Sequence, residues 1–312
     1  MSRALEQELW LQIRAGFRLV ALETVEEERA LRLLERVAKR AERELHTWSL
    51  ATGIDGSGEA AGSLEAAVAA FEGEAEPTLW AVADAHAVLT EPVGLRRLRD
   101  ALPGLAERKQ LVVLLGPVLE LPLEFEREAT RLNLPLPDAA ELRSMFERVV
   151  ANTRDAEVAS ERLDECVRAA LGLTAGEAAR AFRKAWMASG KLSEDAVGLL
   201  AGEKRKALRR IPALTFHEAD GDLGTVGGLG ELKRWLRERR RAFGQEARDF
   251  GLPAPRGLLL LGVQGCGKSL SAKAVASEWR FPLLRLDLAA AFSDPNRSPE
   301  LIIREASSVA ES

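Results

Sequence analysis

The chain of 312 residues carries 44 Lys and Arg against 48 Asp and Glu, giving a formal net charge of -4, and 46% of it is hydrophobic. This composition is typical of a soluble globular protein of about two domains, and its acidity excludes an overall basic field that attracts nucleic acid. No apolar run is long enough to span a membrane, and Cys166 and Cys266 have no metal-ligand spacing, so we expect a protein of the reducing cytoplasm.

Residues 1–137 alternate between strand and helix patterns, which predicts an α/β domain with a parallel sheet covered on both faces. A capping box of Thr24 and Glu27 predicts the start of the helix that follows the first strand. The expected strands are 17–22, 46–50, 78–83, 110–115 and 132–136. The expected helices are 5–14, 24–44, 63–71 and 94–102, the third of them capped by Ser63.

This layout is that of a nucleotide-binding fold in which the residues that usually bind phosphate and Mg²⁺ are replaced. The loop after the first strand has no glycine or lysine, and its carboxylates at 26–28 repel phosphate. Asp84 follows a strand as the Mg²⁺-binding Asp of P-loop enzymes does, but Ala85 stands where the neighbouring acid is expected. We interpret the domain as a degenerate nucleotide fold kept for structure or contacts. A live site at Asp84 and His86 is the alternative to a capping or hydrogen-bonding role.

Residues 138–210 read almost entirely as helix, with capping boxes at Asp138 and Glu141 and at Thr174 and Glu177. The aromatic residues of this segment repeat at helical spacing, which is typical of a core rather than a ligand site. Ser193 is expected to cap a fourth helix. Residues 211–230 hold Pro212 and several glycines and are expected to form a linker.

A helix is expected over 232–250, and one of its faces is strongly basic. A solvated or subunit-facing surface explains this face better than a nucleic-acid site, because no aromatic stacking platform accompanies it. The basic residues concerned are Lys233, Arg234, Arg237, Arg239, Arg240 and Arg241.

Residues 262–269 read GVQGCGKS and match G-x-x-x-x-G-K-[ST], the pattern of a phosphate-binding loop. The apolar run 257–261 before it predicts a buried parallel strand, and 269–279 after it predicts a helix that buries Leu270, Ala274 and Val275. The glycines let backbone N–H groups point at phosphate, Lys268 is expected at the β- and γ-phosphates, and the Ser269 hydroxyl is expected to bind Mg²⁺. The candidate nucleotide-binding residues are Gly262, Val263, Gln264, Gly265, Cys266, Gly267, Lys268, Ser269 and Leu270. The alternative is a glycine-rich turn with an incidental lysine. Within the motif we interpret Cys266 as a small residue filling a tight loop, and the alternative for it is a reactive thiol at a helix N-terminus beside a lysine.

Together, these motifs resemble the opening of an AAA-class ATPase module. Residues 226–229 (VGGL), 252–257 (LPAPRG) and the phosphate-binding loop carry the resemblance, which narrows to the AAA ATPases of the hypothetical chloroplast reading-frame family of plastids and bacteria. It implies ATP and Mg²⁺ as ligands, self-association through AAA modules and a protein substrate, and it makes Val226 and Gly227 candidates for the adenine pocket. The implied organisation is a degenerate AAA-like α/β domain at 1–137, a helical lid at 138–210, a linker at 211–230 and an incomplete P-loop AAA module at 231–312.

The resemblance also shows what to expect beyond the motif. AAA enzymes carry the Mg²⁺-coordinating Asp and the catalytic Glu on the strand that follows residue 312 here, and the sensors and arginine finger later still. Catalytic residues therefore stay unassigned, and we expect a longer protein or a truncated copy of one. Two interpretations follow: an ATPase that remodels a protein partner, or a non-hydrolysing module that binds nucleotide or partners. In both, we expect this chain alone to bind nucleotide without efficient hydrolysis.

Overall fold

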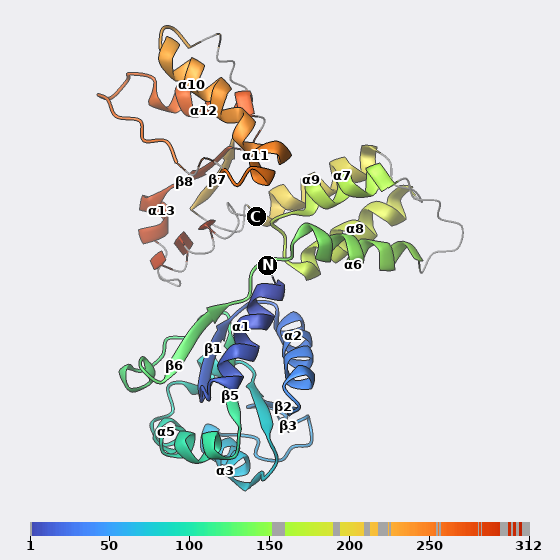
Figure 1. Ribbon diagram of the computed structural model, residues 1–312, viewed down its shortest axis with the longest axis vertical. Helices are drawn as coiled ribbons and strands as arrows, with labels where there is room; N and C mark the ends of the chain where they lie inside the picture. Colours follow the sequence, from blue (N-terminus) through green and yellow to red (C-terminus); the bar gives the residue numbers. More distant parts are fainter. Residues whose placement is uncertain are drawn as a thin grey trace. The chain divides into compact units, whose positions relative to one another are not determined.

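In the computed structural model the chain forms two compact units, Met1–Lys204 and Arg205–Ala310 (Figure 1). The structure describes residues 2–151, 160–189, 194–208, 213–217, 224, 226–253, 255, 257–279, 281, 283–293, 299–300, 302–303 and 306–307.

The first unit is built on a six-stranded sheet in the order β3-β2-β4-β5-β1-β6. All neighbouring strands are parallel except the short β3, which pairs antiparallel with β2. The expected parallel sheet and α/β class are thus confirmed. The strands are β1 Leu19–Glu23, β2 Glu44–Ser49, β3 Gly53–Ile54, β4 Thr78–Val82, β5 Leu111–Gly116 and β6 Ala129–Asn133.

Helices cover both faces of this sheet, as Figure 1 shows. Because side chains alternate along a strand, β1 sends Leu19 and Ala21 to one core and Val20 and Leu22 to the other. Helices α3 and α5 pack on the first face, and α1 and α2 pack on the second. Their bounds are α1 Ser2–Arg14, α2 Glu27–Arg40, α3 Leu64–Gly73 and α5 Pro92–Glu107, with the shorter α4 Ala85–Val88 and the 3₁₀ helix η1 Leu123–Phe125 between strands.

The expected helix starts are confirmed in part. The Ser63 hydroxyl accepts a hydrogen bond from the Ala66 amide at 3.2 Å, as the cap of α3. The Thr24 and Glu27 capping box is wrong, because α2 begins only at Glu27. The Thr24 hydroxyl instead accepts from the Glu26 amide at 2.9 Å, which makes a local turn before the helix.

A group of helices follows the sheet in the first unit. They are α6 Ala139–Ala151, α7 Ser160–Ala170, α8 Ala175–Ser189 and α9 Glu194–Leu208, which runs past the end of this unit at Lys204. The rings of Phe146 and Phe182 stack at 4.0 Å between centroids and are fully buried, which confirms them as core. The capping box of Thr174 and Glu177 forms in both directions, with each backbone amide donating to the other residue's side chain at 3.2 Å. Ser193 lies outside the described residues.

The second unit contains the phosphate-loop motif and an antiparallel pair of strands, β7 Leu214–His217 and β8 Leu283–Leu286. Strand β7 lies within residues that we expected to form a linker. The helices of this unit are α10 Gly230–Arg240, η3 Arg241–Phe243, α11 Gln245–Asp249, α12 Lys268–Trp279 and α13 Leu288–Phe292. The single helix expected over 232–250 is therefore wrong. The chain takes an extended conformation at Gly244, with φ -75° and ψ 163°, and this ends the helical run.

None of the helices in the described ranges has both the length and the apolar composition that crossing a bilayer requires.

Candidate functional site

The phosphate-loop motif forms a tight turn that leads directly into α12. Gly265 and Gly267 have φ angles of +84° and +89°, a region that only glycine enters at little cost. Gly262 matters for a different reason, since a Cβ there would lie 2.5 Å from the Cys266 sulfur and would force that side chain to move. Three of the motif's glycines are thus explained by the loop's own geometry. The interpretation of Cys266 as a small residue filling a tight loop agrees with this contact.

The side chain of Lys268 folds back over the loop. Its ammonium group donates to the carbonyl oxygens of Gly262 at 2.8 Å and Val263 at 2.7 Å, and lies 3.7 Å from the Cys266 sulfur. Lys268 is the first residue of α12 and Ser269 is the second, so the positive end of the helix dipole, the ammonium and the hydroxyl come together. This set of groups fits a phosphate with a bound Mg²⁺, because it offers N–H donors, one positive charge and one hydroxyl ligand.

Helix α12 is held in place through α10. Val226, which is 7% exposed, packs with Leu236 of α10 and Ala274 of α12. The indole N–H of Trp279 donates to the Leu236 carbonyl at 2.9 Å. The structure thus brings Val226, a candidate from the resemblance, to the helix that starts at the motif. Gly227 follows it in an exposed position.

The surroundings of the motif differ from expectation in two respects. Residues 257–261 were expected to be a buried strand, but they are irregular, and Leu259 and Leu261 are 80% and 83% exposed. In the described part of this unit the strand pairing is between β7 and β8, so the segment lacks the neighbours that bury a central parallel strand. Leu270 was expected in the core of α12 but is 45% exposed, and Ser271 and Ala276 are buried with Ala274 instead.

Part of the basic face of α10 makes contacts within the unit. The Lys233 ammonium donates to the Val226 carbonyl at 2.5 Å, and the Arg239 guanidinium lies over the Trp235 ring at 5.5 Å. A further pair, Arg240 and Glu278, lies at 4.0 Å. We predicted Lys233 as part of an exposed surface. Only its position next to the apolar Leu232 indicated that it could contact the interior of the unit. These contacts favour a structural surface over a nucleic-acid site.

The candidate positions of the N-terminal domain do not form a second site of this kind. Asp84 has a φ of +48°, is exposed and makes no side-chain capping bond to α4, and His86 is exposed as well. Among the described residues, no group of three or more His, Cys, Asp or Glu side chains is arranged to hold a metal ion.

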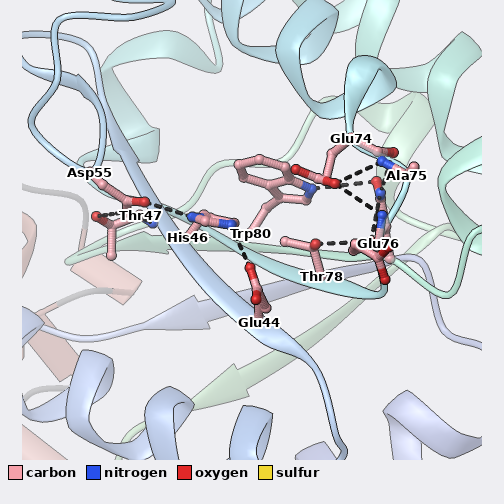
Figure 2. A network of polar contacts seen from close by, with 10 residues as sticks. Glu44, His46, Thr47, Asp55, Glu74, Ala75, Glu76, Thr78 and Trp80 are labelled. Atoms are coloured by element: carbon pink, nitrogen blue, oxygen red, sulfur yellow. Dashed lines mark hydrogen bonds and ion pairs between the residues drawn. The ribbon is translucent and has the colours of Figure 1, made fainter.

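A polar cluster formed by β2 and by Asp55, which follows β3, illustrates this last result. Figure 2 shows His46 in contact with Asp55 through Nδ1, at 2.6 Å, and with Glu44 through Nε2, at 3.4 Å. The two carboxylates meet different ring nitrogens and do not converge on one point. Burial raises the pKa of Asp55, but hydrogen bonds from His46 and Thr47 outweigh it and hold that pKa below its ordinary value.

Three known protein families match parts of the chain. The family described as "SpoVK-like AAA ATPase, N-terminal domain" matches residues 5–134, and that described as "SpoVK-like AAA ATPase, second domain" matches 140–211. The chain carries SpoVK-like AAA ATPase domains. The AAA family, "ATPase family associated with various cellular activities", matches residues 258–311, which include the phosphate-loop motif. The expected resemblance is thereby confirmed.

Individual relatives agree with this assignment. The chain is 29% identical over 311 residues to an uncharacterised AAA domain-containing protein, ycf46, of Trieres chinensis, covering 97% of this chain and 62% of the relative. It is 31% identical over 229 residues to ycf46 of Guillardia theta, covering 73% of this chain and 45% of the relative. A proteasome-associated ATPase of Acidimicrobium ferrooxidans is 42% identical over 74 residues, 23% of this chain and 12% of that protein. The chain thus spans about half to three fifths of the length of its ycf46 relatives.

Proposed function

We propose that residues 262–270 bind the phosphates of ATP and that ATP, through this site, powers the remodelling of a protein partner. The chain is an AAA-type ATP-binding protein by family. The observation that supports this particular site is the loop itself, in which positive-φ glycines, the Lys268 ammonium and the start of α12 come together. In the proposal, Lys268 exchanges its contacts to the loop carbonyls for β- and γ-phosphate oxygens.

Each remaining candidate has a stated part in the proposed site. The amides of Gly265, Cys266 and Gly267 cradle the phosphates, and the Ser269 hydroxyl binds Mg²⁺, which supplies the positive charge that balances the triphosphate. Val226 and Gly227 border the adenine, since Val226 packs against Ala274 of α12, the helix that begins at Lys268. Gly262, Val263, Gln264 and Leu270 complete the loop and the first turn of the helix.

The partner and assembly follow from the family rather than from the site. We propose self-association through AAA modules and a protein substrate, in the cytoplasm. No role in nucleic-acid binding is proposed, because the net charge is -4 and two residues of the basic face, Lys233 and Arg239, make contacts within their own unit.

The test is ATP binding and hydrolysis by the intact protein and by its Lys268→Ala variant. Removing a charged hydrogen-bond donor is expected to weaken ATP binding roughly ten- to hundredfold and to abolish turnover. Lys273→Ala is the matched control, because Lys273 lies exposed on the same helix. Equal ATP affinity in the two variants would refute the proposed site.

The second candidate is a non-hydrolysing module that binds nucleotide or a partner. It is favoured by the exposed and unpaired residues 257–261, since an ATPase core needs a positioned water and a group to orient it beside a formed sheet. Binding that is lost in Lys268→Ala, with no turnover in the intact protein, would establish this candidate. Turnover by the 312-residue chain alone, lost in the same variant, would contradict our expectation that this chain binds without efficient hydrolysis.

A further inference from the structure

The N-terminal domain has a distinctive loop at the carboxyl end of β1. Strands β2, β4 and β5 lie on one side of β1 and β6 lies on the other, so the strand order reverses at β1. In open α/β sheets, ligands bind beyond the carboxyl ends of the strands at such a reversal. The loop that begins there carries Glu26 in place of the glycines and lysine that hold phosphate.

The Glu26 carboxylate binds the N-terminus of a helix in the same unit. Its Oε1 accepts a hydrogen bond at 2.5 Å from the amide of Ala175, the first residue of the 15-residue helix α8. Its Oε2 accepts from Arg29 Nη1 at 2.8 Å, and the Glu26 side chain is only 8% exposed. A carboxylate in this position offers α8 the negative charge that its N-terminus favours.

Arg29 continues the connection to a second helix. Its Nη2 donates to Glu141 Oε2 of α6 at 2.7 Å, and its Nη1 donates to the Pro135 carbonyl at 2.5 Å. The Arg29 side chain is 11% exposed. One guanidinium thus joins α2 to α6 and to the segment before it, while its partner Glu26 joins the same loop to α8.

We propose that Glu26 and Arg29 form a clamp that holds the helical second domain closed on the N-terminal α/β domain without any nucleotide. A phosphate at this end of β1 would itself attract a helix N-terminus and a guanidinium, and the Glu26 carboxylate engages both of these. The contact between the α/β domain and the helical domain, both in the first unit, is therefore constitutive. Any motion driven by ATP originates in the second unit, Arg205–Ala310. The proposal does not rest on the activity of the phosphate-loop motif.

The burial of the clamp determines how it responds to mutation. Removing Glu26 takes away one of the two carboxylates that Arg29 contacts and leaves this buried guanidinium with Glu141 alone, which is destabilising. The neighbouring acid Glu28 provides the contrast. Its side chain is 92% exposed and its contact with Arg32 is a surface pair at 3.9 Å, so its loss is expected to change little.

The experiment is amide hydrogen exchange of the 312-residue chain carrying Lys268→Ala, which silences the phosphate-loop motif. In this background, Glu26→Ala is expected to speed exchange in the first turn of α8 about tenfold or more, because the Ala175 amide loses a charged acceptor. Glu28→Ala is the matched control and is expected to leave exchange unchanged. Added ATP is expected to leave α8 protection unchanged in all three proteins.

Two results would overturn the proposal. One is unchanged protection of α8 in folded Glu26→Ala, as judged by circular dichroism. The other is increased protection of α8 on adding ATP to the chain with an intact clamp. If Glu26→Ala does not fold, Glu26→Gln decides, because it keeps the shape and an acceptor for Ala175 but loses the charge facing Arg29. Faster exchange in Glu26→Gln supports the clamp, and exchange equal to that of Glu28→Ala contradicts it.

Discussion

Gly267→Ala gives a sharp test of the loop geometry. Gly267 has a φ of +89°, and a Cβ added to it would meet no heavy atom within 4 Å. The substitution therefore adds backbone strain without a steric clash. Holding an alanine in the left-handed region costs about 1–2 kcal/mol. The free loop of the variant can relax this strain, whereas the nucleotide-bound loop must keep the left-handed backbone, so the strain opposes binding. Because 1.4 kcal/mol is a factor of ten in an equilibrium constant, we expect ATP affinity to fall roughly 5- to 30-fold.

The assay is isothermal titration calorimetry of ATP with the 312-residue chain in the presence of Mg²⁺. Gly257→Ala is the matched control, since it also has open space around its Cβ but its φ lies outside the left-handed region. The control is expected to bind ATP with the affinity of the parent chain. Equal affinities for Gly267→Ala and Gly257→Ala would refute the reasoning, because the loop would then not depend on the left-handed backbone at Gly267.

Three further predictions follow from the described contacts. In the native chain a thiol reagent at pH 8 is expected to modify the exposed Cys266 and not the buried Cys166, whose pKa burial raises to about 11, and mass spectrometry of labelled peptides will show this. Gly262→Ala is expected to weaken ATP binding, because a Cβ at 262 would lie 2.5 Å from the Cys266 sulfur. Adding Cys266→Ala is expected to restore binding, since the Cys266 Cβ lies 3.7 Å away. If calorimetry shows no such rescue, the contact with the sulfur is not the cause. The pKa of Asp55 is lower in the folded chain than its ordinary value of 3.8, so its contribution to stability is present above that pH and is lost as the pH falls through the folded pKa. Asp55→Asn is therefore expected to lower the urea midpoint of unfolding at pH 7 and to reduce the fall of that midpoint below about pH 4. Parallel curves of midpoint against pH for the variant and the parent chain would contradict this.

Local pattern was sufficient to predict much of the fold. Strands β4 and β5 consist of five or six consecutive buried residues, and α2 buries a stripe that includes Leu34, Val37 and Ala38. The cap at Ser63 and the capping box at Thr174 were also predicted correctly, because each requires only residues three positions apart.

The failures have physical causes that no short window of sequence contains. The apolar run 257–261 looks like a buried strand, but burial depends on neighbouring strands, and the described part of that unit pairs β7 with β8 instead. The helix expected over 232–250 is interrupted at Gly244, whose low helix propensity was outweighed in our prediction by the surrounding periodicity.

The candidate sites show the same division. The phosphate-loop motif is contiguous, and the sequence alone predicted both the turn and the helix that follows it. ATP binding at these residues stays a prediction. The clamp was not foreseen, because Glu26 and Arg29 meet Ala175, Pro135 and Glu141, which are 149, 106 and 112 positions away from them. The sequence indicated only that carboxylates stood in a loop where phosphate is usually held.

The attachment of α12 at its far end has a mechanical consequence. Lys268 begins this helix and Trp279 ends it, so its 12 residues form a stiff rod roughly 18 Å long. Trp279 is tied to α10 through the Leu236 carbonyl and packs edge-on against Phe243 at 5.1 Å. Trp279 therefore lies at the other end of a stiff helix from Lys268, and we expect a tilt of α12 to change the surroundings of its indole and so its fluorescence.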